Sequence, residues 1–168
     1  SEDPLLTGRI CAAQVKAMAK SEIGSTIKHF CGNNQEVGRS TSDSVMSERC
    51  LREIYLKGFE IAVKEGGARS VMTTYGSANG LWTAGSYDLC TTILRKEWGF
   101  QGIVMTDWWA KSNYEGHQAE VTSKAPMVAA QNDIYMVVRD AKSNPENDDV
   151  EEMLHAGKLT LGELQRNG

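Results

Sequence analysis

The sequence lacks the features that mark several large classes of protein. It has no dense run of lysine and arginine and a net charge of -4, which argues against nucleic acid as a main partner. Its longest apolar runs are too short to cross a bilayer, so no membrane association is expected. No G-x-G-x-x-G follows an expected strand and no G-x-x-x-x-G-K-[ST] occurs, so nucleotide binding has little support.

Cysteines are few and widely spaced. Cys11, Cys31, Cys50 and Cys90 form no Cys-x-x-Cys pair, so a zinc site is not expected, and no other metal or cofactor is indicated. Their apolar neighbours favour buried free thiols in a reducing compartment, and therefore a cytoplasmic location. A Cys11–Cys31 disulfide and a secreted or periplasmic location stay open as alternatives, although no secretory signal pattern is recognisable.

The chain of 168 residues is long enough for one domain with a core of its own. Its content of 40% hydrophobic and 24% charged residues is ordinary for a soluble globular protein. Residues 141–150 are polar and acidic and are expected to form a linker. We therefore expect a main domain over residues 1–140, followed by a linker and helical tail over residues 141–168.

Helices and strands are expected to alternate along the chain. Apolar residues at helical spacing predict helices, and short apolar runs bounded by loop residues predict strands. Ser42 or Asp43 is expected to cap the longest helix. The expected helices are Leu6–Lys20, Ser44–Lys64, Tyr87–Glu97, Glu151–Ala156 and Leu161–Arg166. The expected strands are Gly24–Phe30, Ser70–Tyr75, Gly102–Asp107 and Asp133–Val138.

This alternation predicts right-handed βαβ units and a parallel sheet, hence the α/β class. The run Gly102–Asp107 is apolar almost to its end, which suggests that the sheet is buried on both faces. A closed eight-stranded barrel and an open doubly wound sheet both fit the pattern.

Three of the expected strands end in polar or aromatic side chains: Lys28 and His29, Tyr75, and Asp107 with Trp108. Because parallel strands share one rim at their carboxyl ends, these side chains should converge. Each has a structural alternative as a cap, a solvated cation, a core histidine or a core aromatic. Their co-location favours a functional site over these structural roles, since such groups are costly to bury together without a partner. A sugar, with hydroxyls and an apolar face, is a partner of this kind.

Seven segments, in order, resemble motifs of glycoside hydrolase family 3. They are Ser1-Glu-Asp-Pro-Leu-Leu-Thr-Gly8, Ile27-Lys-His-Phe30, Asn33-Asn-Gln-Glu36, Glu48-Arg-Cys-Leu-Arg-Glu-Ile-Tyr-Leu56, Val71-Met-Thr-Thr-Tyr75, Ile93-Leu-Arg-Lys-Glu-Trp-Gly-Phe100 and Gly102-Ile-Val-Met-Thr-Asp-Trp108. A weaker resemblance continues through Ala130–Met136, where Gln131 stands at a position that is often glycine in the family, and through Ala156–Leu161.

The resemblance implies a fragment of a β-glucosidase, with about half of a TIM-type (β/α) barrel in this chain. Asp107, in the Thr-Asp-Trp motif, would be the nucleophile of a retaining mechanism. A second carboxyl group must protonate the leaving oxygen and later activate water. In most of the family's β-glucosidases it belongs to a further domain, so the acid/base residue is expected outside this chain.

The resemblance also implies how a sugar is bound. Lys28, His29 and Arg39 would bind its hydroxyls. Tyr75 would help to orient the nucleophile, and Trp108 would form a stacking wall. The implied substrates are β-linked glucosides or short oligosaccharides.

Two other interpretations remain at this stage. The chain could be a non-catalytic, sugar-binding or structural half-barrel, or an unrelated α/β domain. A half-barrel leaves strand edges unpaired near Ser25–Phe30 and Ile134–Val138, which predicts a homo-oligomer or partner domains outside this chain.

Overall fold

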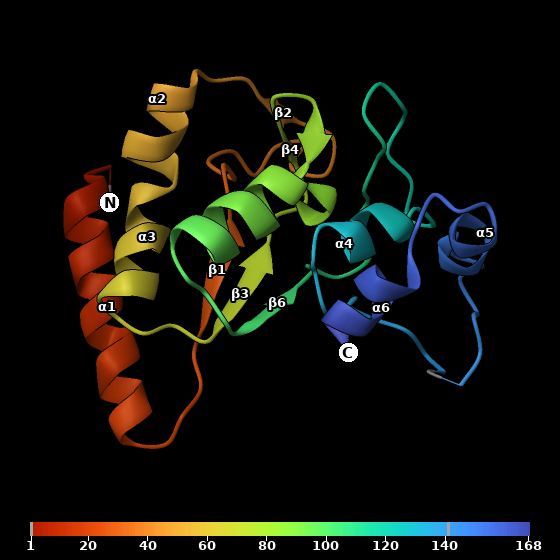
Figure 1. Ribbon diagram of the computed structural model, residues 1–168. Coiled ribbons are helices and arrows are strands. Elements are labelled where there is room, and N and C mark those ends of the chain that lie inside the picture. The colour runs from red at the N-terminus through yellow and green to blue at the C-terminus, as the bar shows by residue number, and fades with distance from the viewer. Residues whose placement is uncertain (1, 141) are drawn as a thin grey trace.

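A parallel three-stranded sheet lies at the centre of the computed structural model, which describes residues 2–140 and 142–168 (Figure 1). Its strand order is β1 (Thr26–Phe30), β3 (Ser70–Thr73) and β6 (Ile103–Met105). A smaller sheet contains β2 (Asp43–Ser44), β4 (Ser77–Ala78) and β5 (Leu81–Trp82). The helical segments are α1 (Pro4–Lys20), α2 (Glu48–Cys50), η1 (Leu51–Tyr55), α3 (Lys57–Lys64), η2 (Thr83–Gly85), η3 (Asp88–Glu97), α4 (Ala125–Ala129), α5 (Val150–His155) and α6 (Leu161–Asn167).

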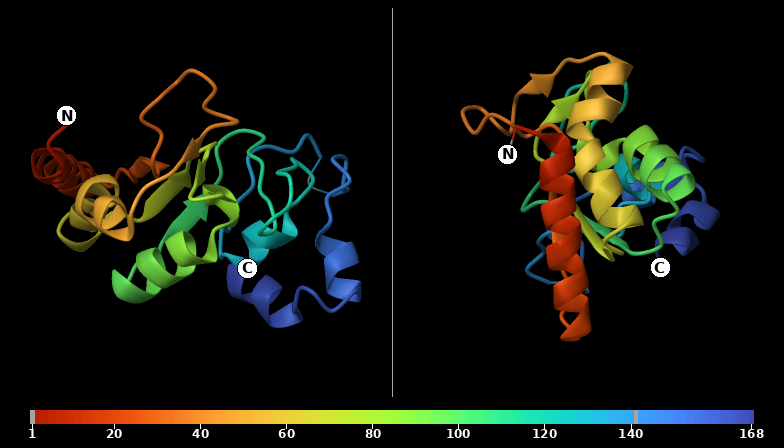
Figure 2. Two further views of the ribbon diagram at one scale, coloured as in Figure 1. Left: turned by 90° about the horizontal axis from the view of Figure 1, so that it is seen from above. Right: turned by 90° about the vertical axis from the view of Figure 1, so that its left-hand side faces the viewer.

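The central sheet buries an apolar row on the face that the helices cover. Val71 of β3 pairs with Ile27 of β1 and with Val104 of β6, and all three are buried. Successive side chains of a strand point to opposite faces, so Ile103 belongs to the other face, and it is exposed. The expectation of burial on both faces is therefore wrong for Ile103, because α1, α3 and η3 lie on one side of the sheet (Figure 2).

The fourth expected strand, Asp133–Val138, is reduced to a single bridging residue. Ile134 pairs in parallel with Met105, next to β6. Two residues later, the N–H of Met136 donates to the side-chain Oγ1 of Thr106 at 2.9 Å instead of to a backbone carbonyl. The regular ladder ends there because a side chain takes the place of the next backbone partner.

The long helix expected over Ser44–Lys64 begins later, at α2, and continues through the π-helix η1 into α3. The hydroxyl of Ser47 caps it by accepting a backbone N–H of the first turn at 3.2 Å. Ser42 and Asp43 do not cap it, because Asp43 lies in β2, where its carboxylate accepts the hydroxyl of Ser77 at 2.8 Å.

Helix α1 packs closely against α3. A Cβ atom at Gly8 would lie 2.7 Å from Cδ1 of Ile61, so glycine permits this approach. The carboxylate of Asp3 caps α1 by accepting two backbone N–H groups of the first turn, at 2.8 and 2.9 Å. The helix therefore starts at Pro4, slightly before the expected start at Leu6.

The main hydrophobic core lies between the central sheet and this helical layer. The ring of Phe30, at the end of β1, is fully buried. It meets the rings of Phe59 and Trp98 edge-on, with centroids 5.2 and 6.1 Å away. Aromatic contacts therefore join β1 to α3 and to the residue that follows η3.

All four cysteines are free, so the alternative Cys11–Cys31 disulfide does not form. Cys31 and Cys90 lie fully buried in the main core. Burial raises the pKa of both thiols to about 12, which keeps them protonated at neutral pH. Cys11 and Cys50 are partly exposed.

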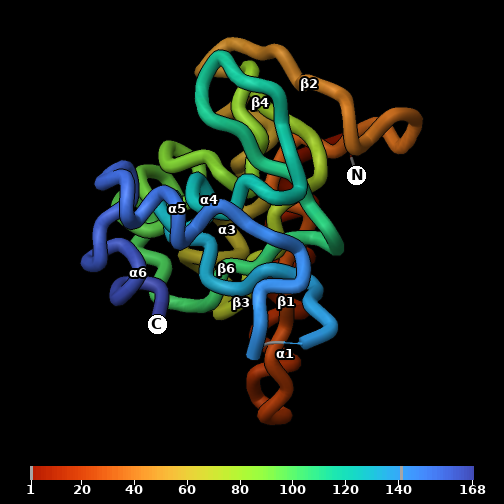
Figure 3. The backbone as a smooth tube through the Cα atoms, turned by 90° about the vertical axis from the view of Figure 1, so that its right-hand side faces the viewer, coloured from red at the N-terminus to blue at the C-terminus, as the bar shows by residue number. Residues whose placement is uncertain are grey.

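The C-terminal helices α5 and α6 pack against α4 (Figure 3). Val128 of α4 and Leu159 are buried in this smaller core. A capping box of Thr160 and Glu163 starts α6, and the side chain of Arg166 donates to the carbonyl of Ala129 at 2.9 Å. None of the helices in the described ranges combines the length and apolar character needed to span a membrane.

Candidate functional site

Two of the predicted side chains, those of His29 and Tyr75, converge on Asp107, which follows β6 by two residues. His29 lies in β1, and its Nε2 is 3.3 Å from Oδ2 of Asp107. Tyr75 follows β3 by two residues, and its phenol forms a hydrogen bond with the same carboxylate. The carboxyl ends of three parallel strands thus bring together an imidazole, a phenol and a carboxylate, as the sequence predicts.

The Asp107 carboxylate is held from two directions and is nearly buried, with 8% of its side chain exposed. Its Oδ1 accepts the backbone N–H of Trp108 at 2.8 Å, while Oδ2 faces His29. Asp107 does not cap a helix, since the next helix along the chain is α4. Its side chain therefore has a fixed orientation at the carboxyl end of the sheet.

The imidazole of His29 is neutral at neutral pH. Burial lowers its pKa first, the positive charges of Lys28 and Arg39 lower it further, and the negative charge of Asp107 opposes them. Its contact with Asp107 is therefore that of a neutral ring beside a carboxylate.

Arg39 and Tyr75 stack beside the carboxylate. The guanidinium carbon of Arg39 lies 4.9 Å from the centre of the Tyr75 ring, and Arg39 also pairs with Glu36 at 3.0 Å. Burial, the hydrogen bond to Asp107 and the charge of Asp107 raise the pKa of Tyr75. The phenol therefore stays protonated and donates to the carboxylate.

Lys28 is exposed, and it lines a pocket of about 610 Å³ together with His29. This pocket runs along the edge between α1 and β1, and Asp107 is not among its lining residues. The structure thus places Lys28 beside His29 in the same strand without a direct contact to the carboxylate.

Two exposed indoles follow Asp107. Trp108 is 39% exposed and Trp109 is 56% exposed. Trp109 has a left-handed backbone conformation, with φ of 52°, and its N–H donates to the carbonyl of Met136 at 2.6 Å. Sequence reasoning overlooked Trp109, although a second tryptophan directly after the first was the available signal.

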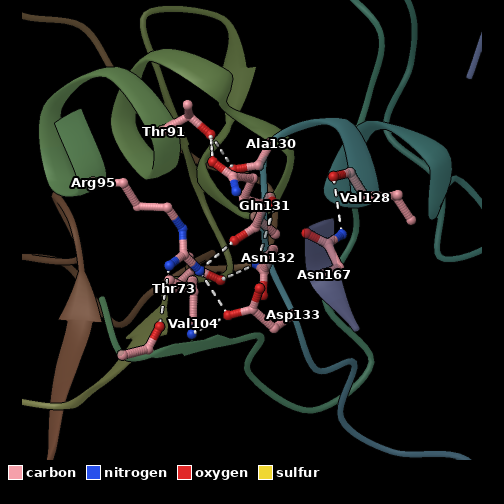
Figure 4. A network of polar contacts seen from close by, with 12 residues as sticks. Thr73, Thr91, Arg95, Val104, Val128, Ala130, Gln131, Asn132, Asp133 and Asn167 are labelled. Atoms are coloured by element: carbon pink, nitrogen blue, oxygen red, sulfur yellow. Dashed lines mark hydrogen bonds and ion pairs between the residues drawn. The ribbon is translucent and has the colours of Figure 1, made fainter. Parts of the chain in front are cut away.

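A polar network supports the strands that carry the site (Figure 4). Arg95 of η3 donates to Oδ2 of Asp133 at 2.7 Å, and the same oxygen accepts the N–H of Val104 in β6 at 2.8 Å. Asn132 is fully buried and donates to Oγ1 of Thr73, at the end of β3, at 3.3 Å. The Asn132–Asp133 pair therefore joins η3 to the end of β3 and to the middle of β6.

No metal centre is evident within residues 2–140 and 142–168. Those residues contain no group of three or more His, Cys, Asp or Glu side chains able to hold an ion. The chemistry that the described side chains offer is that of a fixed carboxylate with a neutral imidazole, a protonated phenol and exposed indoles around it.

Comparison with known proteins gives a consistent result. The family described as Glycosyl hydrolase family 3 N terminal domain matches residues 1–167. A beta-glucosidase of Ruminococcus albus is 58% identical over 167 residues, which are 99% of this chain and 17% of that enzyme. The crystal structure of a beta-glucosidase from Paenibacillus barengoltzii matches with a TM-score of 0.97 and 57% identity, over 99% of this chain and 18% of that chain.

A more distant structure shows the same fold. Beta-glucosidase 3B from Thermotoga neapolitana, solved in complex with alpha-D-glucose, matches with a TM-score of 0.84 and 38% identity, over 99% of this chain and 22% of that chain. This chain thus spans between 17% and 22% of the length of these three relatives. The predicted partial (β/α) barrel is confirmed, and the chain belongs to glycosyl hydrolase family 3, of whose N-terminal domain it forms a part.

Proposed function

We propose that the protein containing this chain is a retaining β-glucosidase and that Asp107 is its nucleophile. The observation that carries this proposal is the convergence of side chains from three strands on one nearly buried carboxylate. The relatives named beta-glucosidase support β-linked glucosides or short oligosaccharides as substrates. The neutral His29 leaves the attacking carboxylate without a strong ion pair at this contact.

The proposed mechanism has two displacements at the anomeric carbon. An oxygen of Asp107 attacks that carbon and forms a glycosyl ester, while the bond to the leaving oxygen breaks. A second carboxyl group, about 5–5.5 Å away, protonates the leaving oxygen and then deprotonates the water that cleaves the ester. Two inversions give overall retention. The neighbours of Asp107 described above are an imidazole, a phenol and an amide, so we propose that the second carboxyl group lies outside the described residues, 2–140 and 142–168.

Binding of the sugar is proposed to use the groups around Asp107. Lys28, His29 and Arg39 present donors to the hydroxyls of a pyranose. Trp108 presents an exposed indole on which the C–H face of a sugar ring can pack. The protonated Tyr75 donates to Asp107 and thereby keeps the attacking oxygen oriented.

Removing the phenolic hydroxyl of Tyr75 should therefore slow the reaction. Tyr75→Phe is expected to lower kcat on an aryl β-glucoside by about 10- to 100-fold, because a hydrogen bond to a charged group is lost. Tyr87→Phe is the matched control, since the Tyr87 hydroxyl is bonded to Lys96 on the exposed side of η3. Equal kcat values for the two variants would remove Tyr75 from the proposed mechanism.

Trapping the glycosyl ester tests the proposed function directly. An activated 2-deoxy-2-fluoro-β-glucoside should release its leaving group and add one fluoroglucosyl group to Asp107, because the fluorine slows hydrolysis of the ester. Intact mass and peptide mapping would report the adduct and its position. Attachment to another carboxylate would show that this other residue, and not Asp107, is the nucleophile. Glucose binding in a calorimeter, without turnover or adduct, would favour a non-catalytic sugar-binding protein.

A further inference from the structure

Thr106 directly precedes Asp107 and is buried. Its Oγ1 accepts the N–H of Met136 at 2.9 Å, and its own N–H donates to the carbonyl of Ile134 at 2.9 Å. Both the side chain and the main chain of Thr106 are therefore bonded to residues 134–136, the chain segment that lies next to β6.

The same segment also binds the chain after Asp107. The carbonyl of Met136 accepts the N–H of Trp109 at 2.6 Å. The N–H of Met136 thus donates to the residue before Asp107, and the carbonyl of Met136 accepts from the residue after Trp108. The Asp107–Trp108 dipeptide is held between these two bonds, and Trp109 adopts its left-handed conformation at the second one.

The two residues before this segment are firmly anchored. The preceding Asp133 binds Arg95 and the N–H of Val104, and Asn132 binds Thr73 (Figure 4). The bond from Met136 to Thr106 therefore connects the end of β6 to a fixed point in the fold. An apolar side chain at position 106 would leave the N–H of Met136 without this partner.

We propose that the hydroxyl of Thr106 positions the nucleophile: by accepting the N–H of Met136 it sets the turn that aims the Asp107 carboxylate at the anomeric carbon. This inference rests on the proposed function, in which Asp107 attacks the sugar. Thr106 does not touch the substrate in this account and acts through the backbone of its neighbour. A displacement of about 1 Å at the attacking oxygen costs on the order of 100-fold in rate, so a single backbone contact is sufficient to matter.

Three variants separate an effect on the position of the Asp107 carboxylate from an effect on the stability of the fold. Thr106→Val keeps the shape of the side chain and removes the acceptor, and Thr106→Ser restores the acceptor. Thr91→Val is the matched control, because Thr91 is equally buried and its hydroxyl donates to the carbonyl of Ala130 at 2.8 Å, just before residues 134–136. The control lies in η3 and does not adjoin Asp107.

The measurements are kcat and KM on an aryl β-glucoside, and the rate of fluoroglucosyl labelling. For Thr106→Val we expect kcat and the labelling rate to fall by about 10- to 100-fold, with KM within about twofold of the wild type. Thr106→Ser should recover most of the lost rate, and Thr91→Val should retain the wild-type kcat even where its thermal midpoint falls. If Thr106→Val does not fold, Thr106→Ala compared with Thr106→Ser gives the same contrast.

The outcomes distinguish this inference from the proposed function. Labelling of Asp107 at an unchanged rate in Thr106→Val, or an equal loss of kcat in Thr91→Val, would overturn the positioning role and leave the proposed function intact. Absence of any adduct on Asp107 in the wild-type protein would overturn both.

Discussion

Replacing Asp107 with asparagine should lower kcat on an aryl β-glucoside by about 10⁴-fold or more, because the amide cannot form the glycosyl ester. This loss corresponds to roughly 5 kcal/mol of activation free energy. Asparagine keeps the size of the side chain and can still accept the N–H of Trp108, so the fold of the turn should persist. Aryl leaving groups that depart readily need little help from an acid, so they isolate the role of the nucleophile.

A small external nucleophile provides a second test of Asp107. In Asp107→Ala, azide should enter the vacated space, attack the anomeric carbon and expel the aryl oxide, giving an α-glucosyl azide. Asp88→Asn is the control, because Asp88 is exposed on η3 and should have no effect on turnover. If Asp107→Asn turned over the glucoside as fast as Asp88→Asn, Asp107 would not be the nucleophile.

The largest expected loss of stability comes from the ion pair behind the site. Asp133→Ala should lower the free energy of unfolding by about 3–5 kcal/mol, because it leaves the Arg95 guanidinium without its partner in a largely buried place. The two side chains are only 15% and 16% exposed and lie 2.7 Å apart. The N–H of Val104 loses its acceptor as well. The thermal midpoint should fall by roughly 6–20 °C.

An exposed ion pair of similar geometry provides the comparison. Arg49 and Glu53 lie 3.1 Å apart on the helix surface, so Glu53→Ala should cost less than about 1 kcal/mol. A double variant, Arg95→Met with Asp133→Asn, should lose less stability than Asp133→Ala, because no charge stays unpaired and Val104 keeps an acceptor. Similar thermal midpoints for Asp133→Ala and Glu53→Ala would show that the buried ion pair stabilises the fold no more than the exposed one.

The convergence of the site could be predicted because it follows from one rule of parallel sheets. Apolar runs mark β1, β3 and β6, and the carboxyl ends of such strands share a rim. His29, Tyr75 and Asp107 lie at or just beyond those ends, so their meeting required no knowledge of the connecting loops. The part of the site that depends on the parallel direction of the strands could therefore be predicted from the sequence.

Features that are set by tertiary contacts could not be predicted from the sequence. Ser42, Asp43 and Ser47 are all suitable helix caps, and the choice of Ser47 depends on Asp43 being bonded to Ser77, far along the chain. The early end of the strand after Ile134 likewise depends on the hydroxyl of Thr106, which no local pattern identifies.

The backbone conformation of Gln131 is another feature that the sequence indicated only in part. Gln131 has φ of 60°, the left-handed region that glycine prefers, at the position where the family resemblance suggests glycine. Motif comparison marked Gln131 as a departure from the family, and its left-handed backbone was seen only in the structure.

The two core thiols also have a practical consequence. Cys31 and Cys90 are protonated and enclosed, whereas Cys11 and Cys50 reach the surface. A maleimide dye would therefore mark the outer pair first and reach the inner pair only when the sheet and its helices separate. The rate at which Cys31 and Cys90 react would thus measure how often the interior of the protein opens.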